Sequence, residues 1–153
     1  MTDQNELYLQ TQWFDSKQNY PILSEYATPT QYKNENYRSL VGWKIKRDKS
    51  NNDLKLAFLQ DEFQYFSELD KPKTSSGKTT QFIVKNDFNY KITEKGNLNI
   101  IAEFSNTQGK GFGSGIDEIA RNQFSFGALY RHQSSDKLYL ELGTKKDFVE
   151  EIE

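Results

Sequence analysis

The chain has 153 residues, and 20 Lys and Arg nearly balance 22 Asp and Glu, which gives a formal net charge of -2. This balance disfavours nucleic acid as a partner, because phosphate binding needs an excess of positive charge. The absence of cysteine excludes disulfides, thiolate metal sites and a cysteine nucleophile. Since 35% of the residues are apolar and 14% aromatic, we expect one domain over residues 1–153 with a small core of mainly aromatic side chains.

The dominant hydrophobic period is two, which predicts β-strands rather than helices. Seven strands are predicted by alternating apolar residues in the following ranges: 6–14, 37–47, 54–58, 81–92, 98–104, 123–131 and 137–143. Residues 20–26 are a candidate eighth strand. The sequence therefore predicts an all-β, antiparallel meander of seven or eight strands.

Three segments depart from this simple pattern. Residues 59–69 have apolar side chains near helical spacing but are rich in aromatic residues, and we favour a continuation of the preceding strand over a helix. Residues 115–121 could form one short helix, because Asp117 and Glu118 would lie in its first turn. Residues 145–153 are strongly charged, and we expect them to form a frayed tail.

The predicted connections alternate in length along the chain. Short polar turns occupy residues 47–53, 94–97 and 132–136, whereas long connections occupy residues 15–36, 67–79 and 105–122. Successive connections of an antiparallel meander fall at opposite ends of the sheet. We therefore expect the three long loops to gather at one end.

Three architectures fit such a meander. We favour a closed, barrel-like cup with its apolar side chains inside, an architecture that resembles the lipocalin-type cups although no sequence motif carries the likeness. A two-layer sandwich is a second possibility. The third is an outer-membrane barrel, which would turn Phe88, Ile100 and Phe126 to lipid and gather Lys85, Asp87 and Glu103 inside. We rank it lower, because most apolar segments are shorter than the roughly 9–11 residues of a membrane-crossing strand.

No pattern of catalytic residues is recognisable, and we expect neither an enzyme nor a cofactor or metal. The single histidine, His132, falls in a predicted turn and is best explained as a solvated side chain. The glycine-rich run at residues 109–115 lacks the spacing of a phosphate-binding loop. Adjacent acids such as Asp61 and Glu62 would point to opposite faces of a strand, so they do not form a carboxylate pair for glycoside hydrolysis.

The long-loop end is the best candidate for a binding site, because Tyr and Trp are efficient in binding surfaces. Its rim would also offer Lys and Arg for polar groups of a ligand. The predicted ligand-binding residues are Trp13, Tyr20, Tyr26, Tyr32, Lys78, Phe112 and Arg121. The alternative is that the aromatic side chains among them plug the end of the barrel as ordinary core.

Three functions follow from these alternatives. The first is a non-catalytic protein that binds a small molecule, a glycan or a protein at the long-loop end. The second is an outer-membrane barrel, or part of one, that acts as a pore, adhesin or assembly component. The third is a structural subunit of a larger complex such as a virion or filament. With no apolar helix or signal peptide in the sequence, we expect a cytoplasmic protein, or an exported one whose signal was removed.

Overall fold

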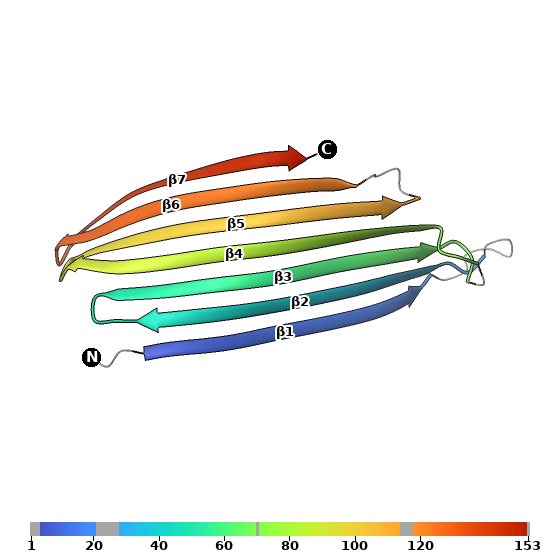
Figure 1. The fold of residues 1–153 in the computed structure, drawn as a ribbon, viewed down its shortest axis with the longest axis horizontal. Coiled ribbons are helices and arrows are strands. Elements are labelled where there is room, and N and C mark those ends of the chain that lie inside the picture. The colour runs from blue at the N-terminus through green and yellow to red at the C-terminus, as the bar shows by residue number, and fades with distance from the viewer. Residues whose placement is uncertain (1–3, 21–27, 70, 114–117, 153) are drawn as a thin grey trace.

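The structure is a computed structural model, and it describes residues 4–20, 28–69, 71–113 and 118–152. These residues form a single sheet in which seven antiparallel strands lie in sequence order (Figure 1). The strands are β1 (Gln4–Asn19), β2 (Gln31–Lys46), β3 (Ser50–Phe66), β4 (Ser75–Thr93), β5 (Gly96–Phe112), β6 (Ile119–Ser135) and β7 (Leu138–Ile152). The predicted all-β antiparallel meander is confirmed. The sheet is an open layer that does not close into a barrel, because β1 pairs only with β2, and β7 only with β6.

The strands are longer than the apolar patterns in the sequence, at 15–19 residues each. Residues 59–66 continue β3, as predicted. The expectation of a frayed tail at residues 145–153 was wrong up to residue 152, because these residues pair with β6 and the ring of Phe148 lies 6.2 Å from that of Phe124. Backbone hydrogen bonds extend a strand even where both of its faces are polar.

The loop asymmetry is also present in the structure. Three short turns join strands at one end of the sheet, and the longer connections lie at the other end (Figure 1). The candidate eighth strand at residues 20–26 lies almost wholly outside the described residues. No helix occurs in the part of the chain that the structure describes, and the described end of the predicted helix, from Ile119, begins β6. His132 is not a turn residue, because it lies within β6 and its ring stacks on Tyr130.

The expected aromatic core is absent from the described residues. None of their hydrophobic side chains is buried, and the buried residues are Gln31, Ser76, Ser105 and Ser125 together with the glycines Gly42 and Gly96. A single sheet has no second layer to pack against, so both of its faces are open. The prediction of a core was wrong because alternation identifies an apolar face but not what covers it.

The strand register separates side chains of opposite character onto the two faces. One row of directly paired residues crosses all seven strands as Leu9, Val41, Leu56, Val84, Phe104, Phe124 and Phe148. The neighbouring row, on the opposite face, consists of Tyr8, Gly42, Lys55, Lys85, Glu103, Ser125 and Asp147. Successive residues of a strand point to opposite faces, so one face is apolar and the other is polar.

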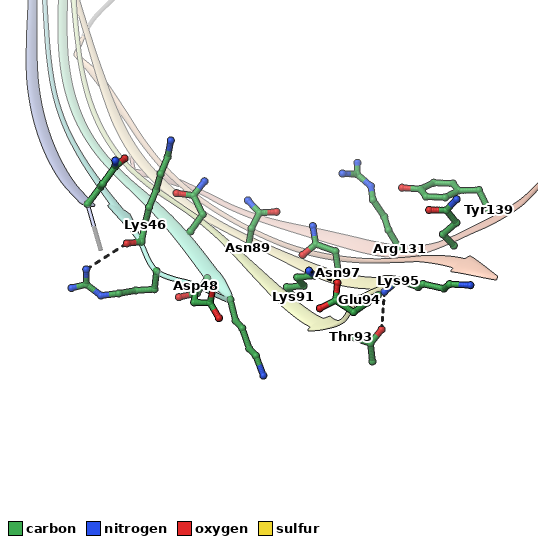
Figure 2. A pocket seen from close by; sticks show the side chains of 17 residues that line it. Lys46, Asp48, Asn89, Lys91, Thr93, Glu94, Lys95, Asn97, Arg131 and Tyr139 are labelled. Atoms are coloured by element: carbon green, nitrogen blue, oxygen red, sulfur yellow. Dashed lines mark hydrogen bonds and ion pairs between the residues drawn. The ribbon is translucent and has the colours of Figure 1, made fainter. Parts of the chain in front are cut away.

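The sheet is curved, and the polar face is its concave side. Figure 2 shows the strands bending together, with Asn89, Asn97, Arg131 and Tyr139 on the inner side of the bend. These four residues share the face of Lys85 and Glu103 in the strand register. We therefore call this side the concave polar face, and the side that carries Val84 and Phe104 the convex apolar face.

Glycines on the concave polar face make room for aromatic rings from neighbouring strands. The ring of Tyr8 lies over Gly42, and the ring of Phe63 lies over Gly77, so closely that a Cβ on either glycine would overlap the ring. Tyr8 also donates a hydrogen bond to Asp53 at 3.3 Å, and the Lys44 ammonium lies 4.8 Å from its ring centre. Glycine at position 42 therefore allows one side chain to link three strands.

Replacing Gly42 by alanine should destabilise the sheet, because the new methyl group would push Tyr8 away from Asp53 and Lys44. We expect a loss of about 1–3 kcal/mol in the free energy of unfolding, as for overpacked sites elsewhere. Gly127→Ala is the matched control, because a Cβ there would have its nearest neighbour at 3.6 Å. Chemical denaturation followed by tryptophan fluorescence measures both, and equal effects would contradict this role of Gly42.

Candidate functional site

The concave polar face carries a network of charged and hydrogen-bonded side chains across the middle of the sheet. Asp53 accepts the hydrogen bond of Tyr8 and lies 3.1 Å from the Lys55 ammonium. On the next strands Lys85 donates to Glu103 at 2.9 Å. Lys85 and Glu103 are two of the three residues, with Asp87, that the membrane alternative places together, and here they form a direct ion pair.

Amide side chains extend this network toward the turn end. Asn99 donates to Asp87 at 2.6 Å and to Asn89 at 3.1 Å, and Asn89 itself donates to Asp87 at 3.1 Å. The Asp87 carboxylate thus accepts two hydrogen bonds from neutral donors. Polar side chains on adjacent strands therefore satisfy one another's hydrogen-bonding groups here.

A separate polar cluster at the last pair of strands is centred on the carboxylate of Asp147. The hydroxyl of Ser125 donates to Asp147 at 2.5 Å, and the Lys145 ammonium lies 3.1 Å from the same carboxylate. No apolar periodicity marks these residues, because β7 is charged on both faces in this region. Only the register between β6 and β7 could have identified Ser125 and Asp147 as partners.

Hollows follow the concave polar face from one end of the strands to the other. The hollow at the turn end includes Lys46, Asn89, Lys91, Asn97, Arg131 and Tyr139 (Figure 2). A second lies over Lys85, Asn99, Glu103, Ser125 and Lys145 in the middle, and a third over Tyr32, Asn34, Phe63, Gly77 and Gly109 at the long-loop end. Cations and anions are interspersed along this path.

The turn end of this path includes a close ion pair. Lys91 donates to Glu94 at 2.8 Å. The hydrogen bond and the positive charge of Lys91 hold the pKa of Glu94 below its ordinary value. Glu94 therefore stays ionised in mildly acidic solution, and the turn keeps its opposed charges.

The convex apolar face carries a belt of exposed hydrophobic side chains that is interrupted by Ser39 on β2, Asn86 on β4 and Lys146 on β7. Its members include Leu7, Leu9, Trp13, Tyr37, Val41, Trp43, Leu56, Phe58, Phe82, Tyr90, Phe104, Phe124, Phe126 and Leu142. The belt reaches from Tyr37 to Ile45 along β2 and from Leu98 to Phe104 along β5. Those segments are about 27 and 20 Å long at the usual rise per residue. We call this set the apolar belt.

Both borders of the apolar belt have a distinct composition. At the long-loop side Trp13 faces Tyr37, and at the turn side Leu98 pairs with both Tyr90 and Tyr130. Beyond the first border a row of charged residues crosses five strands, and it consists of Asp15, Glu35, Glu62, Lys78 and Lys110. The belt is thus bounded by amphipathic aromatic rings at both borders and by charges beyond the long-loop border.

The apolar belt runs obliquely to the rows of paired residues. At its long-loop border Trp13 lies in the row of Thr80, whereas Phe124 lies in the row of Val84. The border therefore shifts by four residues between β1 and β6. This shift is about 13 Å along the strand direction, over a distance of about 24 Å across the strands. This corresponds to strands tilted by about 30° from the normal to the belt, close to the roughly 35–45° of membrane barrels.

The sequence-predicted binding residues share the long-loop end but lie on two faces. Trp13 and Lys78 are on the convex face, whereas Tyr32 and Arg121 are on the concave face. Tyr20 follows β1, where its backbone N–H donates to Thr30.

Two more of the predicted residues are not fully described. Tyr26 lies outside the described residues, and Phe112 ends β5 with a side chain that the structure does not describe. Among the predicted binding residues, Tyr32 has an aromatic partner: its ring stacks on that of Phe63, with the ring centres 5.8 Å apart. The described members therefore do not form one cluster.

Other kinds of site are not evident in the described parts of the chain. They contain no group of three or more His, Asp or Glu side chains placed to hold a metal ion. No helix in these ranges is long and apolar enough to cross a membrane. No protein-family model matches the sequence, and no curated protein is detectably similar to it.

Asn99→Ala should weaken the concave network, because Asp87 and Asn89 would each lose a hydrogen-bond donor. We expect the free energy of unfolding to fall by about 1–2 kcal/mol, the cost of removing a donor from a charged acceptor. Asn97→Ala is the control on the same strand and face, where the described residues offer the side chain no hydrogen bond. A similar loss for both variants in chemical denaturation would show that the network adds no stability.

Proposed function

We propose that this chain forms part of the wall of a transmembrane β-barrel of the outer-membrane kind. The apolar belt would contact lipid, and the concave polar face would line a water-filled interior. The observation that carries this proposal is the segregation of side chains on a curved single sheet. Ile100 and Phe126 lie on the outside of the bend, whereas Lys85 and Glu103 pair on the inside.

The sign of the curvature argues against the cup that the sequence favoured. A soluble cup encloses its apolar side chains, so its apolar face must be concave. Here the apolar face is convex, and a sheet in water would leave residues such as Trp43 and Phe126 exposed at 46% and 41%. Exposed apolar surface of this extent marks a contact with membrane or protein.

The ends of the strands agree with a membrane setting. Membrane barrels have short turns on one side, longer loops on the other, and aromatic rings at both lipid–water borders. In the proposed barrel Tyr37 and Tyr90 would occupy such borders, and the short turns and long connections are at opposite ends of the sheet (Figure 1). A tilt of about 30° reduces the apolar band to about 17–23 Å, which suits a membrane as thin as the bacterial outer membrane.

Binding of a small molecule or glycan at the long-loop end is our second proposal. The observation that favours it is the hollow beside the stacked rings of Tyr32 and Phe63, which lie close to Asn34 and Asn36. Aromatic rings beside amide groups suit a sugar, whose faces are apolar and whose rim is polar. This second role is compatible with the first, since the hollow lies on the concave polar face.

Adjacent isoleucines provide the first test of lipid contact. Ile100 belongs to the apolar belt, whereas Ile101 lies on the concave polar face opposite Asp87. In lipid vesicles Ile100→Arg should reduce the free energy of unfolding by about 2–4 kcal/mol, the cost of a cation near the bilayer midplane. Ile101→Arg should cost less than about 1 kcal/mol, because a cation there faces water and Asp87. If the two variants lose equal stability in vesicles, the convex face does not contact lipid.

The two tryptophans provide a second test, because both belong to the apolar belt at different heights. Trp43 pairs with Leu7 and Leu54 within the belt, whereas Trp13 lies at its long-loop border. Each tryptophan is measured alone, Trp43 in a Trp13→Phe variant and Trp13 in a Trp43→Phe variant. Lipids brominated near the middle of the acyl chain should quench the fluorescence of Trp43 more than that of Trp13. Fluorescence unaffected by brominated lipid in both variants would refute the membrane proposal.

A further inference from the structure

We infer that this sheet is closed by an odd number of additional β-strands that pair antiparallel with β7 and with β1. The inference rests on the proposed membrane function, and it concerns the two edges of the sheet. Its partner is defined by chemistry: amphipathic strands that are apolar on the convex side and polar on the concave side. Three properties of the edge strands indicate this partner: their unpaired backbone groups, the exposure of their leucine side chains, and the direction in which they run.

The edge strands carry backbone groups that need partners in lipid. Each has a neighbour on one side only, so every second residue leaves its N–H and C=O groups unpaired. In hydrocarbon each such group costs several kcal/mol, and open sheet edges therefore do not occur there. Both edges must be paired wherever they cross the bilayer.

Edge strand β1 lacks two of the features that protect edge strands in water. Proteins in water shield such edges with prolines, bulges, charged side chains or short strands. No proline lies within a described strand. β1 pairs with β2 over 16 residues without a bulge. Such a long regular edge is suited to accept another strand.

Exposure of the leucines points to the same edges. Leu7 on β1 and Leu142 on β7 are 75% and 76% exposed, whereas Leu56 in the middle of the sheet is 41% exposed. All three lie on the convex apolar face. The difference reflects the missing neighbour, because an adjacent strand would cover one flank of each edge leucine.

The directions of the edge strands determine whether the number of added strands is odd or even. Both β1 and β7 run from the turn end to the long-loop end (Figure 1). A strand next to β7 must run back toward the turn end, and so must the strand next to β1. The number of added strands is therefore odd, and the total is even, as in bacterial membrane barrels.

A second copy of this chain does not meet these requirements. In the same membrane orientation its β1 would run parallel to β7, unlike the six antiparallel pairs within the sheet. In the inverted orientation its long connections would lie on the opposite side of the membrane. The matching strand is instead a different sequence, apolar beside Leu140 and Leu142 and polar beside Lys145 and Asp147.

An appended strand tests this inference in detergent micelles. The sequence of residues 119–135, the present antiparallel partner of β7, is fused after Glu153 through a short Gly/Ser loop. We expect backbone amides of β7 to exchange hydrogen at least tenfold more slowly than in the unmodified chain, because they gain partners. β4, which already has neighbours on both sides, should remain unchanged and serves as the internal reference.

A scrambled strand of the same composition, without alternation, is the matched control. Equal protection by both fusions, or protection by neither, would overturn the inference. So would a β7 that is already as protected as β4 in the unmodified chain. The tests of lipid contact at Ile100 and Trp43 do not depend on what pairs with the edge strands. A negative result in the exchange experiment can therefore be distinguished from a failure of the membrane proposal.

Cysteine substitution tests the second copy directly, since the chain has no cysteine of its own. Leu7→Cys and Leu142→Cys are combined in one chain and oxidised in micelles. We expect the chain to remain monomeric on a denaturing gel. Efficient disulfide-linked dimers would show that a second copy occupies the edges and would overturn the inference.

Discussion

Backbone hydrogen bonding between antiparallel strands is the constraint on which the rest of this structure depends. The described residues contain no buried hydrophobic side chain, so no interior packing holds the seven strands together. The ladders between strands assign every residue to one face, since successive side chains alternate. Lys85 and Val84 are neighbours in sequence, yet one takes part in an ion pair on the concave side and the other lies among hydrophobic side chains on the convex side.

The contacts on the concave side explain how so polar a chain holds one register. Tyr8 fits over Gly42, Lys85 pairs with Glu103, and Ser125 bonds to Asp147. Each contact joins neighbouring strands, and a slip of one residue between two strands would break the contact that joins them. A polar network therefore supplies the specificity that a packed core supplies in other folds.

Much of this fold is readable from the sequence, but the direction of bending is not. Alternation correctly placed Phe88 and Ile100 together and Lys85 with Glu103 on the other face, because period two is a local property. The ends of β1 and β2 were missed because both faces of these strands are polar near Asp15 and Lys33. The partnership of Ser125 with Asp147 depends on the register between two strands, which a single sequence does not reveal.

The charged row beyond the apolar belt has a mechanical consequence. Strand β1 continues from Asp15 to Asn19 past that row, and β3 continues from Glu62 to Phe66. Five residues of paired strand have a length of about 15 Å, so in the proposed membrane setting the sheet would project from the lipid surface as a stiff rim. The ends of β1 and β3 would then be held away from the headgroups on a rigid support.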